Sequence, residues 1–166
     1  MHDDFLFCGT TKLSIVIPAF NEEHRLPELF RALRGFNGDP GDFEIIIVDD
    51  GSTDKTAEIG EDFLRDFNYK GGVISLPKNL GKGNALREGV LLTDSPFLLT
   101  VDADMATDLS DLDHALNLLS DHHMVIGSRN LPNSEIVGMP LRRRLLTKSF
   151  NQIFRLVTNI ELSDTQ

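Results

Sequence analysis

Short, nearly continuous apolar runs recur along the chain and predict β-strands. Five such runs, rich in β-branched residues, cover residues 13–19, 43–48, 72–76, 96–101 and 124–127. Apolar and polar positions do not alternate strictly within them, which is typical of strands that are covered on both faces. The pattern therefore predicts a sheet that lies between helices.

Segments with helical spacing of apolar residues separate these runs, at about residues 27–33, 55–67, 84–92 and 111–119. Regular alternation of strand and helix predicts an α/β fold with a doubly wound, mainly parallel sheet. We expect one domain over residues 13–166, preceded by an extension at residues 1–12. A further helical pattern at residues 141–157 is amphipathic and basic, and it fits either a membrane surface or packing against the sheet.

Ligands of doubly wound sheets bind beyond the carboxyl ends of the strands. Four segments of this chain follow predicted strands, at residues 18–23, 49–53, 78–83 and 102–107. Three of them carry acidic residues, and the segment at 78–83 is rich in glycine and lysine. We therefore expect the binding site where these four segments meet.

Charge and cysteine content narrow the range of functions. The 166 residues carry a net charge of -10, and because residues 141–166 carry +3, the first 140 carry -13. This negative charge argues against nucleic-acid binding, which needs a broad positive surface. The single cysteine, Cys8, leaves no intramolecular disulfide and no cysteine-based zinc site.

Asp102 and Asp104 are the strongest candidates for a metal site. Side chains two residues apart on an extended segment point the same way, so these carboxylates can converge at the end of the fourth strand. Hard oxygen ligands with open positions suit Mg²⁺ or Mn²⁺. The alternative is a solvated loop that caps the next helix.

Two further strand ends carry residues that could take part in ligand binding. Asp49 and Asp50 precede a glycine turn, where one acid can face a ligand while the other braces the loop. Lys82 opens a helix whose amino terminus could face an anion, which makes it a candidate substrate-binding residue. The same glycine-rich stretch completes neither the dinucleotide-binding fingerprint nor a P-loop, because Leu86 stands where the third glycine is needed.

Taken in order, the motifs LSIVIPAFNEE, IIIVDDGSTDKT, NLGKGNALREG, VDADMAT and VIGSR resemble the family-2 glycosyltransferases of the GT-A fold. Within that family the chain is similar to polyprenyl-phosphate sugar transferases, both the dolichyl-phosphate glucosyltransferases and the dolichol-phosphate mannose synthases. The DADMAT form and the terminal DTQ favour the glucosyl branch. Relatives continue beyond the position of Gln166, so we expect a catalytic domain that is incomplete at its C-terminal end.

The resemblance implies roles for individual residues. Those expected to line the base and ribose pocket are Pro18, Phe20, Glu22, Val48 and Asp50, with Asp50 accepting a hydrogen bond from the base. Asp102 and Ala103 are expected to contact the nucleoside and diphosphate, and Asp104, with Asp102, to hold the metal. Arg129 and Arg143 are expected to meet phosphate on the acceptor side. Asp102, Asp104 and Arg129 are thus the expected catalytic residues.

Three positions depart from the pattern of these relatives. Phe20 stands where many have tyrosine, so a hydroxyl contact is lost while stacking on the base survives. Ala106 stands where mannose synthases have a glutamine that assists the metal, which leaves water to fill that ligand position. The third departure is the end of the chain described above.

The implied reaction is an inverting, metal-dependent transfer of a hexose, glucose before mannose, from UDP-glucose or GDP-mannose to a polyprenyl or dolichyl phosphate. Mg²⁺ or Mn²⁺ is the implied cofactor, and the implied location is cytoplasmic, with peripheral membrane contact through residues 141–157. Nucleic acid is not an expected partner. The alternatives are a saccharide acceptor, nucleotidyl transfer as in sugar-nucleotide pyrophosphorylases, and a non-catalytic module that binds nucleotide sugars.

Overall fold

The computed structural model describes residues 12–35, 42–104 and 112–127. The chain divides into two compact units, residues 1–113 and 114–166, and all described strands belong to the first. The elements follow the order β1 (Leu13–Ala19), α1 (Leu26–Gly35), β2 (Phe43–Asp49), α2 (Thr56–Asp66), β3 (Lys70–Ser75), α3 (Lys82–Val90), β4 (Phe97–Thr100) and α4 (Leu112–Leu118). No described helix combines the length and the apolar character needed to cross a membrane.

Strands and helices alternate as the sequence predicted, with one correction. The apolar run at residues 124–127 is not a strand: its backbone has no regular secondary structure, and Met124 is 71% exposed. A short apolar run becomes a strand only when a neighbouring strand pairs with its backbone, and no such pairing involves these residues in the described sheet. The basic helix predicted at residues 141–157 lies outside the described residues.

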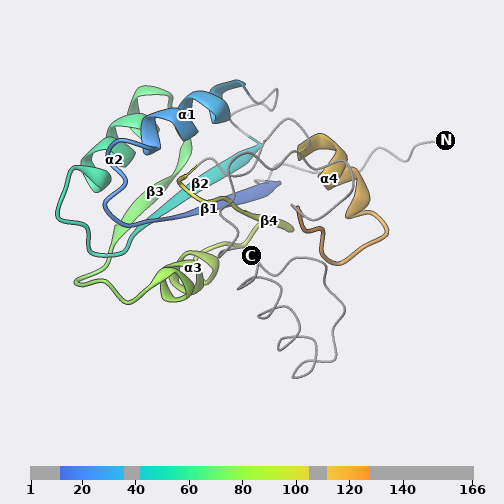
Figure 1. Ribbon diagram of the computed structural model, residues 1–166. Helices are drawn as coiled ribbons and strands as arrows, with labels where there is room; N and C mark the ends of the chain where they lie inside the picture. Colours follow the sequence, from blue (N-terminus) through green and yellow to red (C-terminus); the bar gives the residue numbers. More distant parts are fainter. Residues whose placement is uncertain (1–11, 36–41, 105–111, 128–166) are drawn as a thin grey trace, which may run out of the picture. The chain divides into compact units, whose positions relative to one another are not determined.

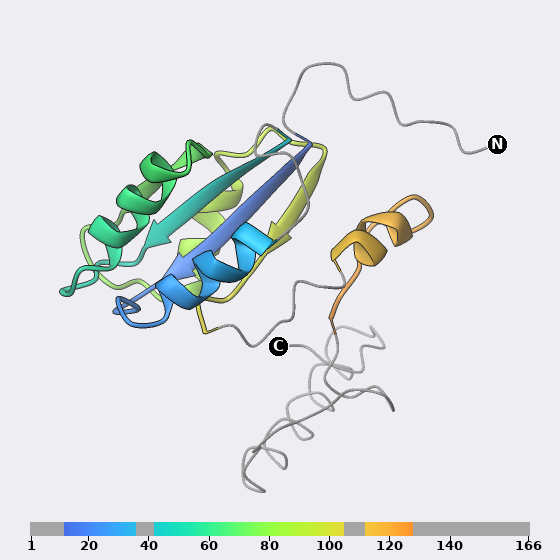
Figure 2. The ribbon, with the colours of Figure 1, turned by 90° about the horizontal axis from the view of Figure 1, so that it is seen from above.

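The four strands form one parallel sheet in the order β3-β2-β1-β4. Strand β1 pairs with β2 along its whole length, from Leu13 opposite Phe43 to Ala19 opposite Asp49. After β3 the chain returns across the sheet and adds β4 on the free side of β1 (Figures 1 and 2). The order of the strands therefore reverses between β1 and β4, which is where doubly wound sheets bind their ligands.

Helices cover both faces of this sheet. Val16, Ile46 and Val48 point to one face and form a buried cluster with Ala85 of α3. Gly60 of α2 packs against Ile47 on the other face, where α1 and α2 lie together (Figure 1). The Phe30 ring of α1 stacks on the Phe63 ring of α2 at a centroid distance of 3.8 Å. The predicted doubly wound arrangement is confirmed.

Helix α3 lies very close to the sheet because of Gly89. A Cβ atom at this position would be 2.5 Å from Cγ1 of Val16 and 3.0 Å from Cγ2 of Val48. Only a residue without a side chain lets the helix approach this far. The close approach fixes the start of α3, at Lys82, beside the carboxyl ends of β1 and β4.

Candidate active site

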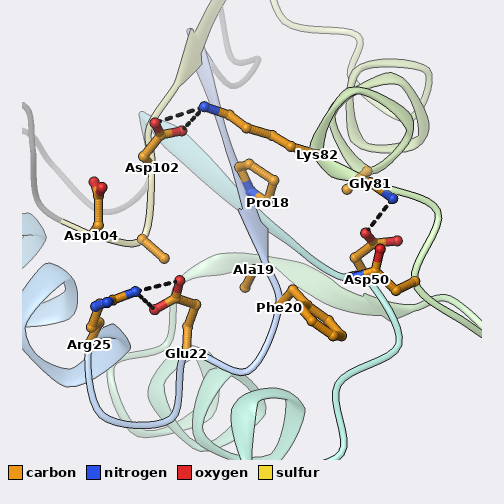
Figure 3. Close-up of a pocket in the computed structure, with 13 residues that line it drawn as sticks. Pro18, Ala19, Phe20, Glu22, Arg25, Asp50, Gly81, Lys82, Asp102 and Asp104 are labelled. Atoms are coloured by element: carbon orange, nitrogen blue, oxygen red, sulfur yellow. Dashed lines mark hydrogen bonds and ion pairs between the residues drawn. The ribbon is translucent and has the colours of Figure 1, made fainter. Parts of the chain in front are cut away.

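One pocket, with a cavity volume of about 420 Å³, opens at the carboxyl ends of the strands. This size is within the usual range of small-molecule sites. Its walls come from the segments that follow β1, β2, β3 and β4 (Figure 3). The lining residues are Pro18, Ala19, Phe20, Glu22, Arg25, Asp50, Asn79, Gly81, Lys82, Ala85, Asp102, Ala103 and Asp104. The four segments singled out in the sequence therefore do meet in one place.

The loops after β1 and β2 form a single interlocked structure. Asn21, whose φ of 54° is in the left-handed region, donates its N–H to Ser52 Oγ at 2.9 Å. Its side-chain Oδ1 accepts the N–H of Thr53, also at 2.9 Å. The N–H of Glu22 donates to Thr56 Oγ1 at 2.8 Å. The loops after β1 and β2 therefore stabilise each other, and together they hold the pocket wall that carries Glu22.

Asp54 extends the same interlock through its carboxylate. One oxygen accepts the N–H of Glu23 at 3.2 Å, and the other accepts the N–H and the hydroxyl of Thr56. Burial alone would raise the pKa of Asp54, but the hydrogen bonds from Thr56 and Glu23 outweigh it and hold the pKa below its ordinary value. The ionised form is therefore the one that stabilises these loops.

We expect Asp54→Asn to lower the free energy of unfolding by about 1 kcal/mol at pH 7, because an amide cannot accept all three hydrogen bonds. A lowered folded-state pKa means that the stabilisation is present above the unfolded-state pKa, near 3.9, and is lost as pH falls through the folded value. Urea unfolding of both proteins between pH 7 and pH 3 measures this. The difference between them should shrink below about pH 4, and a constant difference would contradict the assignment.

Asp50 joins the end of β2 to the start of α3. Its side chain is almost fully buried, and its two oxygens accept the N–H groups of Leu80 at 2.8 Å and Gly81 at 2.7 Å. Asp49 braces its own turn by accepting the N–H of Ser52 at 2.9 Å. Both acids therefore support loops, and Asp50 does so from the pocket wall. Each carboxylate oxygen has a second lone pair with which it can accept another hydrogen bond. That a bound base donates this hydrogen bond to Asp50 stays a prediction.

The carboxylates of Asp102 and Asp104 follow β4 at the opposite wall (Figure 3). Lys82 reaches Asp102 from α3, and its Nζ lies 2.7 Å from both Oδ1 and Oδ2 of that carboxylate. The Lys82 and Asp102 side chains are 58% and 41% exposed, so the ion pair faces the open pocket. The ammonium group offsets part of the repulsion between the two acids.

A second ion pair lines the pocket and includes a residue that sequence reasoning missed. Arg25 Nη1 lies 3.0 Å from each carboxylate oxygen of Glu22. The Glu22 side chain is only 17% exposed, whereas that of Arg25 is 61% exposed. The sequence spacing could have indicated this ion pair, since a basic residue three positions after an acidic one at the start of a helix can contact the acidic side chain. Asn79 is the other polar lining residue that was missed.

The remaining site predictions fall into three groups. Pro18, Phe20 and Ala103 line the pocket, and Phe20, at 42% exposed, presents an aromatic surface to it. Val48 does not line it, because its side chain is fully buried between the sheet and α3. Arg129 and Arg143 lie outside the described residues.

The described residues of the pocket supply only some of the ligands that a divalent cation needs. Among the described residues, no group of three or more His, Cys, Asp or Glu side chains is placed to hold a metal. Asp102 and Asp104 supply two carboxylates at its rim. Mg²⁺ commonly binds through one or two carboxylates and completes its shell with water and substrate phosphates. The donor set thus fits a metal that arrives together with a phosphorylated ligand.

Comparison with known proteins agrees with these features. The family model described as "Glycosyl transferase family 2" matches residues 14–165. Human dolichyl-phosphate beta-glucosyltransferase is 34% identical over an alignment 172 positions long, which covers 95% of this chain and 53% of the relative. The Drosophila melanogaster protein of the same name is 35% identical, with 93% and 52% covered. The chain therefore spans about half the length of these curated relatives.

Solved structures share the architecture. Staphylococcus aureus TarS 1–349 in complex with UDP-GlcNAc aligns with a TM-score of 0.62 and 27% identity, covering 76% of this chain and 37% of TarS. The mannosyltransferase PcManGT from Pyrobaculum calidifontis, in complex with GDP-Man and Mn²⁺, aligns with a TM-score of 0.60 over 66% of this chain and 32% of its own. At 19% identity, that second likeness concerns the fold alone.

Proposed function

Because the chain belongs to glycosyl transferase family 2 and has the GT-A fold, we propose that it forms the donor-binding part of a glucosyltransferase that acts on a polyprenyl or dolichyl phosphate. One observation carries the proposal: paired carboxylates, a lysine and an exposed aromatic ring line the same pocket, at the strand reversal between β1 and β4. The relatives named as dolichyl-phosphate beta-glucosyltransferases support the choice of glucose and of the lipid phosphate.

The donor is proposed to be UDP-glucose. Phe20 offers its ring for stacking on the base, and Asp50 offers a buried carboxylate to a base N–H. The diphosphate would lie near Lys82 and the amino terminus of α3, where a helix favours anions. TarS, at 27% identity, binds UDP-GlcNAc in its crystal structure, which supports UDP over GDP.

Asp104 and Asp102 are proposed to hold Mg²⁺ or Mn²⁺. When bound, the ion would act as a Lewis acid that neutralises charge on the departing diphosphate. Inversion at the anomeric carbon follows from a single in-line attack by the acceptor. A lipid phosphate is already anionic near pH 7, so its oxygen needs no strong base, and no histidine is among the described residues that line the pocket.

The acceptor side is proposed from the sequence. Arginine has a planar fork that suits phosphate, and Arg129 and Arg143 are the candidates. The basic segment at residues 141–157 is proposed to lie on the cytoplasmic face of a membrane, where each Lys or Arg near anionic lipid adds about 1 kcal/mol of attraction.

Transfer of labelled sugar to dolichyl phosphate tests this function. The complete gene product and the 166-residue chain are each incubated with UDP-glucose or GDP-mannose, with Mn²⁺, with Mg²⁺, or with a chelator. We expect metal-dependent transfer from UDP-glucose that the chelator abolishes. Transfer only from GDP-mannose would reassign the donor, transfer only to a saccharide would reassign the acceptor, and no transfer from either donor would refute the proposal.

A further inference from the structure

The ion pair between Lys82 and Asp102 occupies the carboxylate that the proposed metal would need. Both oxygens of Asp102 lie 2.7 Å from the Lys82 ammonium group. The two side chains come from different elements, since Lys82 begins α3 and Asp102 follows β4, 20 residues later. A divalent ion can use Asp102 fully only after this ammonium group has moved away.

This pair is suited to exchange, whereas the other ion pair of the pocket is not. Both partners are well exposed, Lys82 at 58% and Asp102 at 41%, and exposed ion pairs contribute little to stability because water and salt compete with them. Arg25 and Glu22 instead lie three residues apart in one loop, and Glu22 is mostly buried. Lys82 is therefore the cation that can leave its carboxylate at small cost.

We propose that the Lys82 ammonium group occupies the place of the metal at Asp102 until nucleotide binds. In the absence of nucleotide, its ammonium group neutralises Asp102 and keeps the metal affinity of the acidic pair low. A bound diphosphate offers Lys82 a new anionic partner, and the release of Asp102 opens the carboxylate to the cation. The inference rests on the proposed nucleotide site, and in it Lys82 acts as a positioning residue.

The mechanism makes metal and nucleotide bind cooperatively. Whatever increases the metal affinity on nucleotide binding must increase nucleotide affinity by the same factor when the metal binds first. Removing the ammonium group should therefore have two opposite effects. Metal binding alone becomes tighter, and the gain in metal affinity that nucleotide provides becomes smaller.

The test is calorimetric titration of the complete protein with Mn²⁺ alone, with UDP alone, and with Mn²⁺ in saturating UDP. Lys82→Met removes the charge and keeps most of the length of the side chain. Lys78→Met is the matched control, because it removes the same charge from the loop just before α3 and Lys78 does not line the pocket. Circular dichroism verifies that each variant is folded.

We expect Lys82→Met to bind Mn²⁺ without nucleotide about tenfold more tightly than wild type, a change of one like charge beside the site. UDP should bind about tenfold more weakly, and Lys78→Met should behave as wild type in both titrations. Equal Mn²⁺ affinity in the two variants, or no Mn²⁺ binding to Lys82→Met, would overturn the inference. Failure of UDP to bind any of the proteins would instead refute the proposed function, while the Mn²⁺ titration would still decide the role of Lys82.

Discussion

Asp104→Ala should reduce the rate of sugar transfer by about a thousandfold, equivalent to about 4 kcal/mol of lost transition-state stabilisation. The departing diphosphate gains negative charge as the bond to the sugar breaks, and the proposed role of Asp104 is to help hold the cation that neutralises it. Asp102 would then be the one remaining carboxylate of the proposed pair to hold the metal. The loss should appear mainly in kcat, because the charge develops in the transition state.

The measurement is steady-state transfer from UDP-glucose to dolichyl phosphate, together with Mn²⁺ titration. Asp94→Ala is the matched control, since Asp94 is an exposed aspartate just before β4 that does not line the pocket. The control should keep wild-type rates and wild-type Mn²⁺ affinity. If Asp104→Ala kept the wild-type kcat and still bound Mn²⁺, the carboxylate would not be a metal ligand.

The sheet and its open edge were predictable because its two central strands, β1 and β2, are buried on both faces. The run at residues 13–19 is apolar except for Ser14, without the spacing of a helix, and β1 has these bounds. Acidic residues follow these apolar runs directly, so Asp49 and Asp102 mark the edge in the sequence. The parallel arrangement then brings these ends together without any further information.

The failures have physical reasons of their own. Val48 precedes Asp50 by two residues, but its side chain points to the face covered by α3 rather than to the edge. The backbone partners of the Asp50 carboxylate lie 30 and 31 residues away, and no local pattern specifies such a pair. The run at residues 124–127 has strand composition, yet composition supplies no neighbouring strand to pair with it.

Gly89→Ala should destabilise the protein by about 2 kcal/mol, although alanine favours helices by about 1 kcal/mol over glycine. The added Cβ would lie 2.5 Å from Cγ1 of Val16, a fully buried side chain on the central strand β1. Neither that valine nor Val48 has room to withdraw in a close-packed core. The helix must therefore move outward, and contacts along the whole α3 interface weaken.

The displacement should also reach the pocket, because α3 begins at Lys82 and is tied to Asp50 through the N–H of Gly81. We therefore expect weaker UDP binding in Gly89→Ala under conditions where the variant is still folded. Gly83→Ala is the matched control in the same helix, since a Cβ there meets nothing within 4 Å. Urea unfolding followed by circular dichroism should show a gain of up to about 1 kcal/mol for Gly83→Ala and a loss for Gly89→Ala. If both variants gained the same free energy of unfolding, the close packing of α3 on β1 would not depend on the lack of a side chain at residue 89.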